Sequence, residues 1–209
     1  MDLPFVKMGK KEAVSSAPAA ASQPEQSDDE LRLKLYKLII ERYREMIEQG
    51  ESRSVADLKA MIDPHHEKLK EIRETITEGF HPYVYEEHFL QAAKMCFEYV
   101  SSFRTIASPV SFWLSFSDMQ ELLAGDEMDK SILLCSLLRS LGSESAKVFL
   151  ADSRNSYVLF QFGGKSYVAD HSQRELSAKE TGEAALSSLK GKILYSFNDK
   201  EYESFSENE

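Results

Sequence analysis

Three carboxylates stand close together at Asp126, Glu127 and Asp129, at the start of an apolar stretch that ends at Gly142. Such a density of oxygen atoms could hold a divalent cation, for which oxygen ligands are the expected type. No calcium-loop spacing accompanies them, however, and a carboxylate in the first turn of a helix also complements the helix dipole. We therefore expect a capped, solvated helix start and no bound metal.

The candidate nucleophiles are two thiols and one hydroxyl. Cys96 and Cys135 both lie inside apolar helical patterns, and free cysteine is among the most buried residue types. Cys135 comes eight positions after Glu127, about 12 Å along a helix, so the two positions cannot share one site. Ser131 lies one turn beyond Glu127 without an evident base. We expect both cysteines to be core thiols, and no disulfide.

The histidines do not form a metal-binding pattern. His65 and His66 precede Glu67, but adjacent residues on a helix do not face each other, and the His-Glu-x-x-His spacing of zinc enzymes is absent. His81 and His88 are seven positions apart with no cysteine or carboxylate cluster around them. Surface or capping roles are expected for these side chains, and no cofactor is predicted.

The first half of the chain has helical patterns. Ser27 to Glu30 fits a capping box, and apolar residues then recur at helical spacing up to a stop at Gly50. Ser54 begins a second, shorter helix. Asp63-Pro64 predicts a third helix start, with Asp as the cap and Pro at the first helical position. A further helix follows Pro82.

The second half mixes helix and strand. Ser117 is expected to begin a capped turn, and the helix from about Met128 to Leu141 is apolar on most sides, as a helix buried against a sheet must be. Gly163-Gly164 predicts a tight hairpin, because both residues can take positive φ. Strands are expected at residues 146–151, 157–162, 165–169 and 193–197.

These patterns divide the chain into four parts. Residues 1–27 are expected to be a disordered tail, because Ala13 to Gln26 has too little apolar mass to order itself. The tail opens with a hydrophobic and basic tip, Met1 to Lys11, which is either a linear docking peptide or a frayed end. Residues 28–107 form a helical region, 108–198 an α+β core, and 199–209 an acidic tail.

Composition limits the classes of function. The 209 residues are 42% hydrophobic and carry a formal net charge of −10, which disfavours nucleic acid and anionic membranes, whose binding needs a basic face. We find no signal-peptide pattern and no stretch of about eighteen apolar residues that could span a bilayer. The two cysteines show no spacing motif and offer no disulfide framework, which fits a protein of a reducing compartment. The sequence therefore predicts a cytoplasmic protein without a membrane span.

One region resembles a known family. Gly125-Asp126, Asp129 and the run Leu138 to Gly142, followed by a strand hairpin that ends in Asp170, are similar to the core of the transglutaminase-like, papain-like superfamily. The resemblance covers about Phe112 to Ser172. It implies a buried helix packed on a small antiparallel sheet, behind an all-helical N-terminal region.

The resemblance also implies that the catalytic triad is degenerate. In the family a cysteine nucleophile occupies the position of Glu127, and a histidine base opens the middle strand, where this chain has Asn155. Asp170 matches the third member, although His171 replaces the proline that usually follows. On an extended strand His171 should point to the face opposite Asp170, and it would enter the cleft only if the register differed by one residue.

The leading interpretation is a catalytically inactive transglutaminase-like protein that binds a protein or peptide partner. Its relic cleft would be lined by Asp126, Glu127, Asp129, Asn155, Tyr157 and Asp170. The alternative is a cysteine-protease-like or amide-transferring enzyme with a rearranged site. A third is a purely structural scaffold whose cleft is closed.

Overall fold

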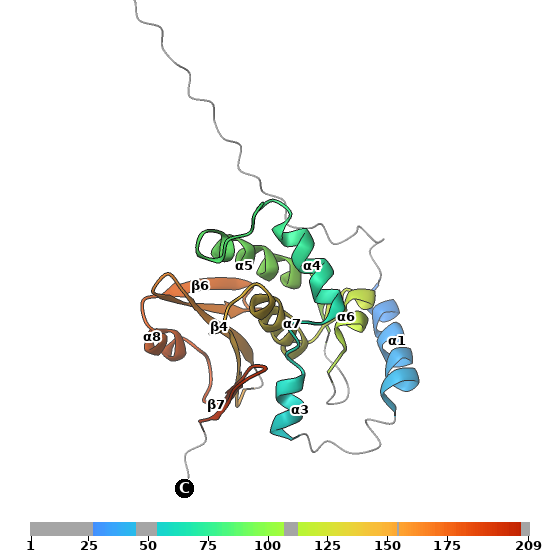
Figure 1. Cartoon of the computed structure of the whole chain (residues 1–209). Helices are drawn as coiled ribbons and strands as arrows, with labels where there is room; N and C mark the ends of the chain where they lie inside the picture. Colours follow the sequence, from blue (N-terminus) through green and yellow to red (C-terminus); the bar gives the residue numbers. More distant parts are fainter. Residues whose placement is uncertain (1–26, 45–53, 107–112, 154, 206–209) are drawn as a thin grey trace, which may run out of the picture.

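The computed structural model of the chain describes residues 27–44, 54–106, 113–153 and 155–205. It is an α+β fold in which a mainly helical half packs against one face of an antiparallel sheet (Figure 1). The predicted tail, residues 1–27, lies outside the described residues except for Ser27.

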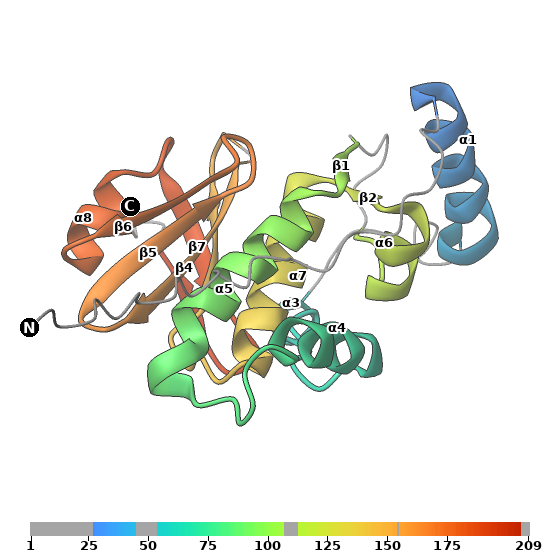
Figure 2. The same cartoon turned by 90° about the horizontal axis from the view of Figure 1, so that it is seen from above.

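The helical half ends in the helix that carries the candidate site. Its elements are α1 (Asp28–Leu38), the π-helical turn η1 (Ile39–Tyr43), α3 (Val55–Ala60), α4 (Glu67–Thr77), α5 (Tyr85–Ser101), β1 (Arg104–Thr105), α6 (Phe116–Leu122), β2 (Ala124–Gly125) and α7 (Glu127–Ser140). The two short strands β1 and β2 pair in parallel, directly before α7. Helix α7 contacts α4, α5, β3 and β4, so it lies between the helices and the sheet (Figure 2).

The sheet has the strand order β6-β5-β4-β3-β7-β8. Its strands are β3 (Lys147–Ala151), β4 (Ser156–Phe162), β5 (Lys165–Asp170), β6 (Glu175–Lys179), β7 (Ile193–Phe197) and β8 (Tyr202–Ser204), and α8 (Gly182–Ser187) joins β6 to the chain before β7. All neighbouring strands run antiparallel. Central strands such as β4 are buried on both faces, as their continuous apolar sequence requires.

Side-chain alternation along the strands creates two cores. Val158, Phe160 and Ala169 belong to the large core shared with the helices. Tyr157, Leu159 and Val168 belong to a smaller core under α8, on the other face. Because successive residues of a strand point to opposite faces, this division fixes which strand residues can reach α7.

Most predicted elements are present. The capping box at Ser27 and Glu30 and the short helix after Ser54 are confirmed, and the buried helix begins at Glu127, within one residue of its predicted start. The hairpin is also confirmed, with φ of 58° at Gly163 and 76° at Gly164. Both cysteines are free and fully buried.

Two predicted helix starts were wrong. Asp63 and Pro64 form a turn in which Asp63 accepts hydrogen bonds from the backbone of His65 and His66, and α4 begins only at Glu67, with His66 as its cap. Helix α6 is capped by Ser115 and not Ser117. In each place a residue two or three positions from the predicted one caps the helix instead.

The sheet extends beyond the predicted boundary at residue 198. Tyr202–Ser204 form β8 and pair with Tyr195 to Phe197 of β7, so described residues of the expected acidic tail belong to the sheet. No helix within the described ranges is long and apolar enough to cross a membrane.

Candidate functional site

The start of α7 is a closed hydrogen-bonded cap. The Asp129 amide donates to Asp126 Oδ1 over 2.7 Å, and the Asp126 amide donates to Asp129 Oδ2 over 3.1 Å. Asp129 Oδ1 also accepts from the Leu114 amide at 3.0 Å. A Cβ atom at Gly125 would lie 3.0 Å from both Asp129 Cβ and Met119 Cε, so a larger residue here would have to push one of these neighbours aside. Two of the three predicted carboxylates are therefore used to cap the helix.

Glu127 is half-buried, as Asp126 is, but its side chain takes no part in the cap. Burial raises the pKa of Glu127, the negative charges of Asp170 and Asp126 raise this pKa further, and Lys130 opposes them. The charge of Asp170 is therefore felt at Glu127. The side chain of Asp170 accepts from Ser172 Oγ at 2.6 Å and from the Gln173 amide at 3.1 Å, which closes the turn after β5.

The other two predicted residues lie elsewhere. Asn155 precedes β4, and its carbonyl accepts from the Ala151 amide at 3.0 Å. Tyr157 belongs to the small core under α8, where its hydroxyl donates to the Lys190 carbonyl and accepts from the Lys190 amide. Tyr157 therefore points to the face opposite α7.

The residues that reach the helices are one position later in each strand. Ser156 Oγ lies 2.9 Å from Ser131 Oγ of α7. His171 stacks on Phe97 of α5 with ring centroids 5.2 Å apart, and its Nδ1 lies 3.4 Å from Ser101 Oγ. His171 thus points to the face opposite Asp170, as the alternation predicted, and this face is the one that packs on the helices.

His171 is a neutral, buried base. Burial, together with the positive charge of Lys130, lowers the pKa of His171 to about 3. Its Nε2 is buried and has no hydrogen-bond partner among the described residues. A neutral imidazole nitrogen without a partner is costly to bury, which marks this position as unusual for a purely structural residue.

Lys130 is a member of this region that the sequence analysis missed. It is 2% exposed, and its Nζ donates to the Phe103 carbonyl at 2.6 Å and to Thr105 Oγ1 at 2.8 Å. Burial and then the charge of Arg174 lower the pKa of Lys130 to about 8. A lysine in a helix that is apolar on most sides was the available signal, because lysine is almost never fully buried without partners.

Neither thiol of the chain can act at this site. The sequence holds only Cys96 and Cys135, and both are 0% exposed. Burial raises the pKa of each thiol, which opposes formation of the thiolate, the reactive form. The described residues hold no cluster of three or more His, Cys, Asp or Glu side chains that could bind a metal ion.

The sequence matches no family model and no curated protein. Among solved structures, EGTA-treated LapG of Legionella pneumophila is similar, with a TM-score of 0.50 and 12% identity over 75% of this chain and 88% of LapG. The fold is shared with LapG. A LapG structure without that treatment gives a TM-score of 0.44, and the calcium-bound form gives 0.43, each at 16% identity and over 65% of this chain.

LapG is a transglutaminase-like cysteine protease. At this identity the likeness shows the fold alone.

Proposed function

We propose that this chain is a catalytically inactive module with a transglutaminase-like fold that binds a protein or peptide. One observation carries the proposal. The α7 start, where the family has its nucleophile, holds Glu127, and the two thiols of the chain are completely buried elsewhere. Cysteine-protease chemistry of the LapG type needs a thiolate that a substrate can reach.

The accessible chemistry at the α7 start favours a basic or amide-rich partner. Glu127 and Asp170 lie close enough to influence each other, while Asp126 and Asp129 satisfy each other through the cap. Two neighbouring carboxylates attract a Lys or Arg side chain and also accept amide hydrogen bonds. The hydroxyl of Ser172, which donates to Asp170, would extend such a contact along the end of β5.

A rearranged hydrolase is the second candidate, and one observation favours it. Burial shifts the pKa values of Glu127, Lys130 and His171, and the charge of Lys130 acts on both Glu127 and His171; such groups occur preferentially at functional sites. The buried Lys130 and His171 are, however, closed off from substrate in this structure.

The inactivity prediction is tested with a thiol reagent. Iodoacetamide should label Cys96 and Cys135 of the native protein very slowly, because neither thiol is exposed or readily ionised, and no peptide or amide should be hydrolysed or transamidated at neutral pH. A Glu127→Cys variant is the matched control, since a thiol at this partly exposed position should be labelled readily. If the native protein does turn over a peptide or amide, and Cys135→Ala or Lys130→Met abolishes that turnover, the proposal is wrong.

The binding prediction is tested on an array of immobilised peptides. Peptides rich in lysine and arginine should bind the native chain, and Glu127→Gln should weaken that binding several-fold at low salt and less at high salt, because the lost attraction is electrostatic. Glu183→Gln, on the exposed helix α8, is the control and should change nothing. An equal effect of both substitutions would mean that the α7 start is not the binding surface.

A further inference from the structure

Two adjoining hollows lie around the tip of the β4–β5 hairpin and the outer face of the sheet, and neither is lined by Glu127. One hollow of about 600 Å³ is lined by residues of the hairpin, the start of α5 and the start of α8. A second hollow of about 460 Å³ lies between α8 and strands β3 to β5. Both are lined by Gln161, Ser166 and Gly182, so they adjoin, and we call the two hollows together the α8 groove.

The floor of the α8 groove is apolar. Phe149 and Leu159 face it from β3 and β4, and Leu186 of α8 is 36% exposed beside them. Tyr85 and Phe162 give the hollow at the hairpin end an apolar lining of its own. Helix α8 has only six residues, which is too short to cover the outer face of a sheet of this width.

The walls of the α8 groove are acidic. Lys147 is neutralised by Glu201 at 2.7 Å, and Lys165 by Glu180 at 3.1 Å. Glu86 and Glu144 also line the groove, and no ion pair engages either of them within the described part of the chain. The groove therefore carries an excess of negative charge beside an apolar floor.

The chain itself contains a segment of the complementary chemistry. Residues 3–11 read Leu-Pro-Phe-Val-Lys-Met-Gly-Lys-Lys, with four large apolar side chains, three lysines and no acidic residue. We propose that residues 3–11 of one copy of this chain dock in the α8 groove of a second copy.

The position of α1 favours a second copy over the same chain. Helices α1 and α8 lie at opposite ends of the molecule in both views (Figures 1 and 2). The fifteen residues from 12 to 26 span about 50 Å when fully stretched and about 20 Å on average. A folded body of this size measures roughly 40 Å across, so docking within one chain would require an almost fully stretched connection.

Such docking is heterologous, because one copy contributes the segment and the other contributes the groove. Each copy then keeps one free segment or one free groove, so association continues into open chains or closes into a ring. This surface is separate from the α7 start, and the proposed function does not depend on it.

The test is sedimentation velocity of the full chain from micromolar to near-millimolar concentration. The native chain should self-associate with rising concentration. Phe5→Asp removes an apolar side chain from the segment, and Leu186→Lys removes one from the groove. Each variant should weaken association about tenfold or more, as loss of one buried large apolar side chain predicts. An equimolar mixture of the two variants should form dimers and nothing larger, because it retains one intact segment and one intact groove.

Leu33→Lys is the matched control, because Leu33 is 54% exposed on α1 and lies outside the groove; it should associate like the native chain. The double variant Glu86→Lys/Glu144→Lys provides a second groove change on the surface, in case Leu186→Lys alters folding. A monomer at every concentration, association that survives all the groove and segment variants, or a mixture that does not form dimers would overturn the proposal.

Discussion

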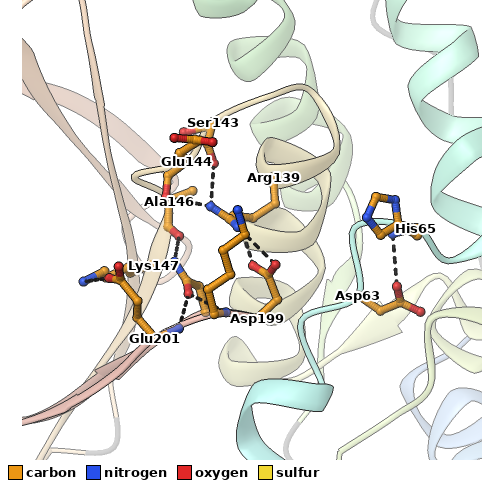
Figure 3. A network of polar contacts seen from close by, with 11 residues as sticks. Asp63, His65, Arg139, Ser143, Glu144, Ala146, Lys147, Asp199 and Glu201 are labelled. Atoms are coloured by element: carbon orange, nitrogen blue, oxygen red, sulfur yellow. Dashed lines mark hydrogen bonds and ion pairs between the residues drawn. The ribbon is translucent and has the colours of Figure 1, made fainter.

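Arg139→Ala is expected to destabilise this protein by about 3 kcal/mol, the low end of the cost of leaving one partner of a buried ion pair alone, because the Asp199 side chain that stays behind is 22% exposed. The Arg139 side chain is 5% exposed, and it binds both carboxylate oxygens of Asp199, from Nε at 2.5 Å and from Nη2 at 3.0 Å (Figure 3). Its Nη1 donates to the carbonyls of Ser143 and Glu144. One guanidinium therefore ties the end of α7 to the following loop and to the segment between β7 and β8.

Thermal melting measures this effect, with a decrease in Tm of roughly 10 °C expected for a chain of this size. Lys147→Ala is the control in the same network, because Lys147 pairs with Glu201, whose side chain is 63% exposed, and exposed ion pairs contribute little. Its Tm should change far less. Equal shifts for the two variants would mean that the Arg139 contacts do not hold α7 to the sheet.

The end of α7 shows how a sequence pattern can reflect structure instead of catalysis. The run from Leu138 to Gly142 resembles the family, and each part of it has a local role here. Gly142 has φ of 104° and ends the helix, and the amide of Ser143 donates to the Leu138 carbonyl at 3.0 Å, as in a Schellman cap. A Cβ at Gly142 would also lie 3.1 Å from Tyr85. The resemblance at this end therefore follows from helix termination and the Arg139 contacts.

The elements that the sequence did not predict are short and weakly patterned. Strand β6, Glu175–Lys179, is an edge strand of mixed exposure, so its residues show no clean alternation between apolar and polar. Helix α8 has six residues and β8 has three, lengths at which periodicity cannot be read. By contrast, α7 and strands β3 to β5 are buried on nearly all sides, and burial is what makes their patterns strong.

The site was harder to predict than the fold because it depends on strand register. A shift of one residue exchanges the two faces of a strand, and the sequence alone cannot say whether Asn155 or Ser156, or Asp170 or His171, faces α7. The contacts of Ser156 with Ser131 and of His171 with Phe97 settle which side chains pack on the helices. The role of Asp126 and Asp129 in the helix cap could be foreseen. An acidic residue at the N-cap followed three positions later by a second one is the spacing of a capping box.

Lys130 could not be predicted as a buried lysine from α7 alone, because its acceptors come from the β1 region. Phe103 and Thr105 are more than twenty residues earlier in the chain, and only the parallel pairing of β1 with β2 brings them beside the first turn of α7. A charged group that is held so far from water makes stability depend on pH.

The stability of the native protein relative to Lys130→Met is expected to rise by about 3 kcal/mol between pH 8 and pH 10.5. The ordinary lysine pKa of 10.5 is lowered to about 8 in the folded chain. Between these values the unfolded chain holds a proton that the folded chain has lost, so a rise in pH favours folding. Each unit of the pKa difference is worth about 1.4 kcal/mol. Below pH 8 both states are protonated, and the native chain carries the full cost of the buried charge.

Urea unfolding of both proteins at pH 7.5, 9 and 10.5 measures this difference. The comparison of the two proteins matters because other buried groups have the opposite pH dependence. The pKa values of Cys96, Cys135 and Tyr43 are raised in the folded chain. These groups therefore ionise first in the unfolded chain, and the free energy of unfolding falls as the pH rises. Those contributions are the same in both proteins and cancel. Lys165→Met removes an exposed lysine and should show no such slope. A pH-independent difference between the native chain and Lys130→Met would mean that Lys130 keeps its proton through this range, and that water reaches the first turn of α7.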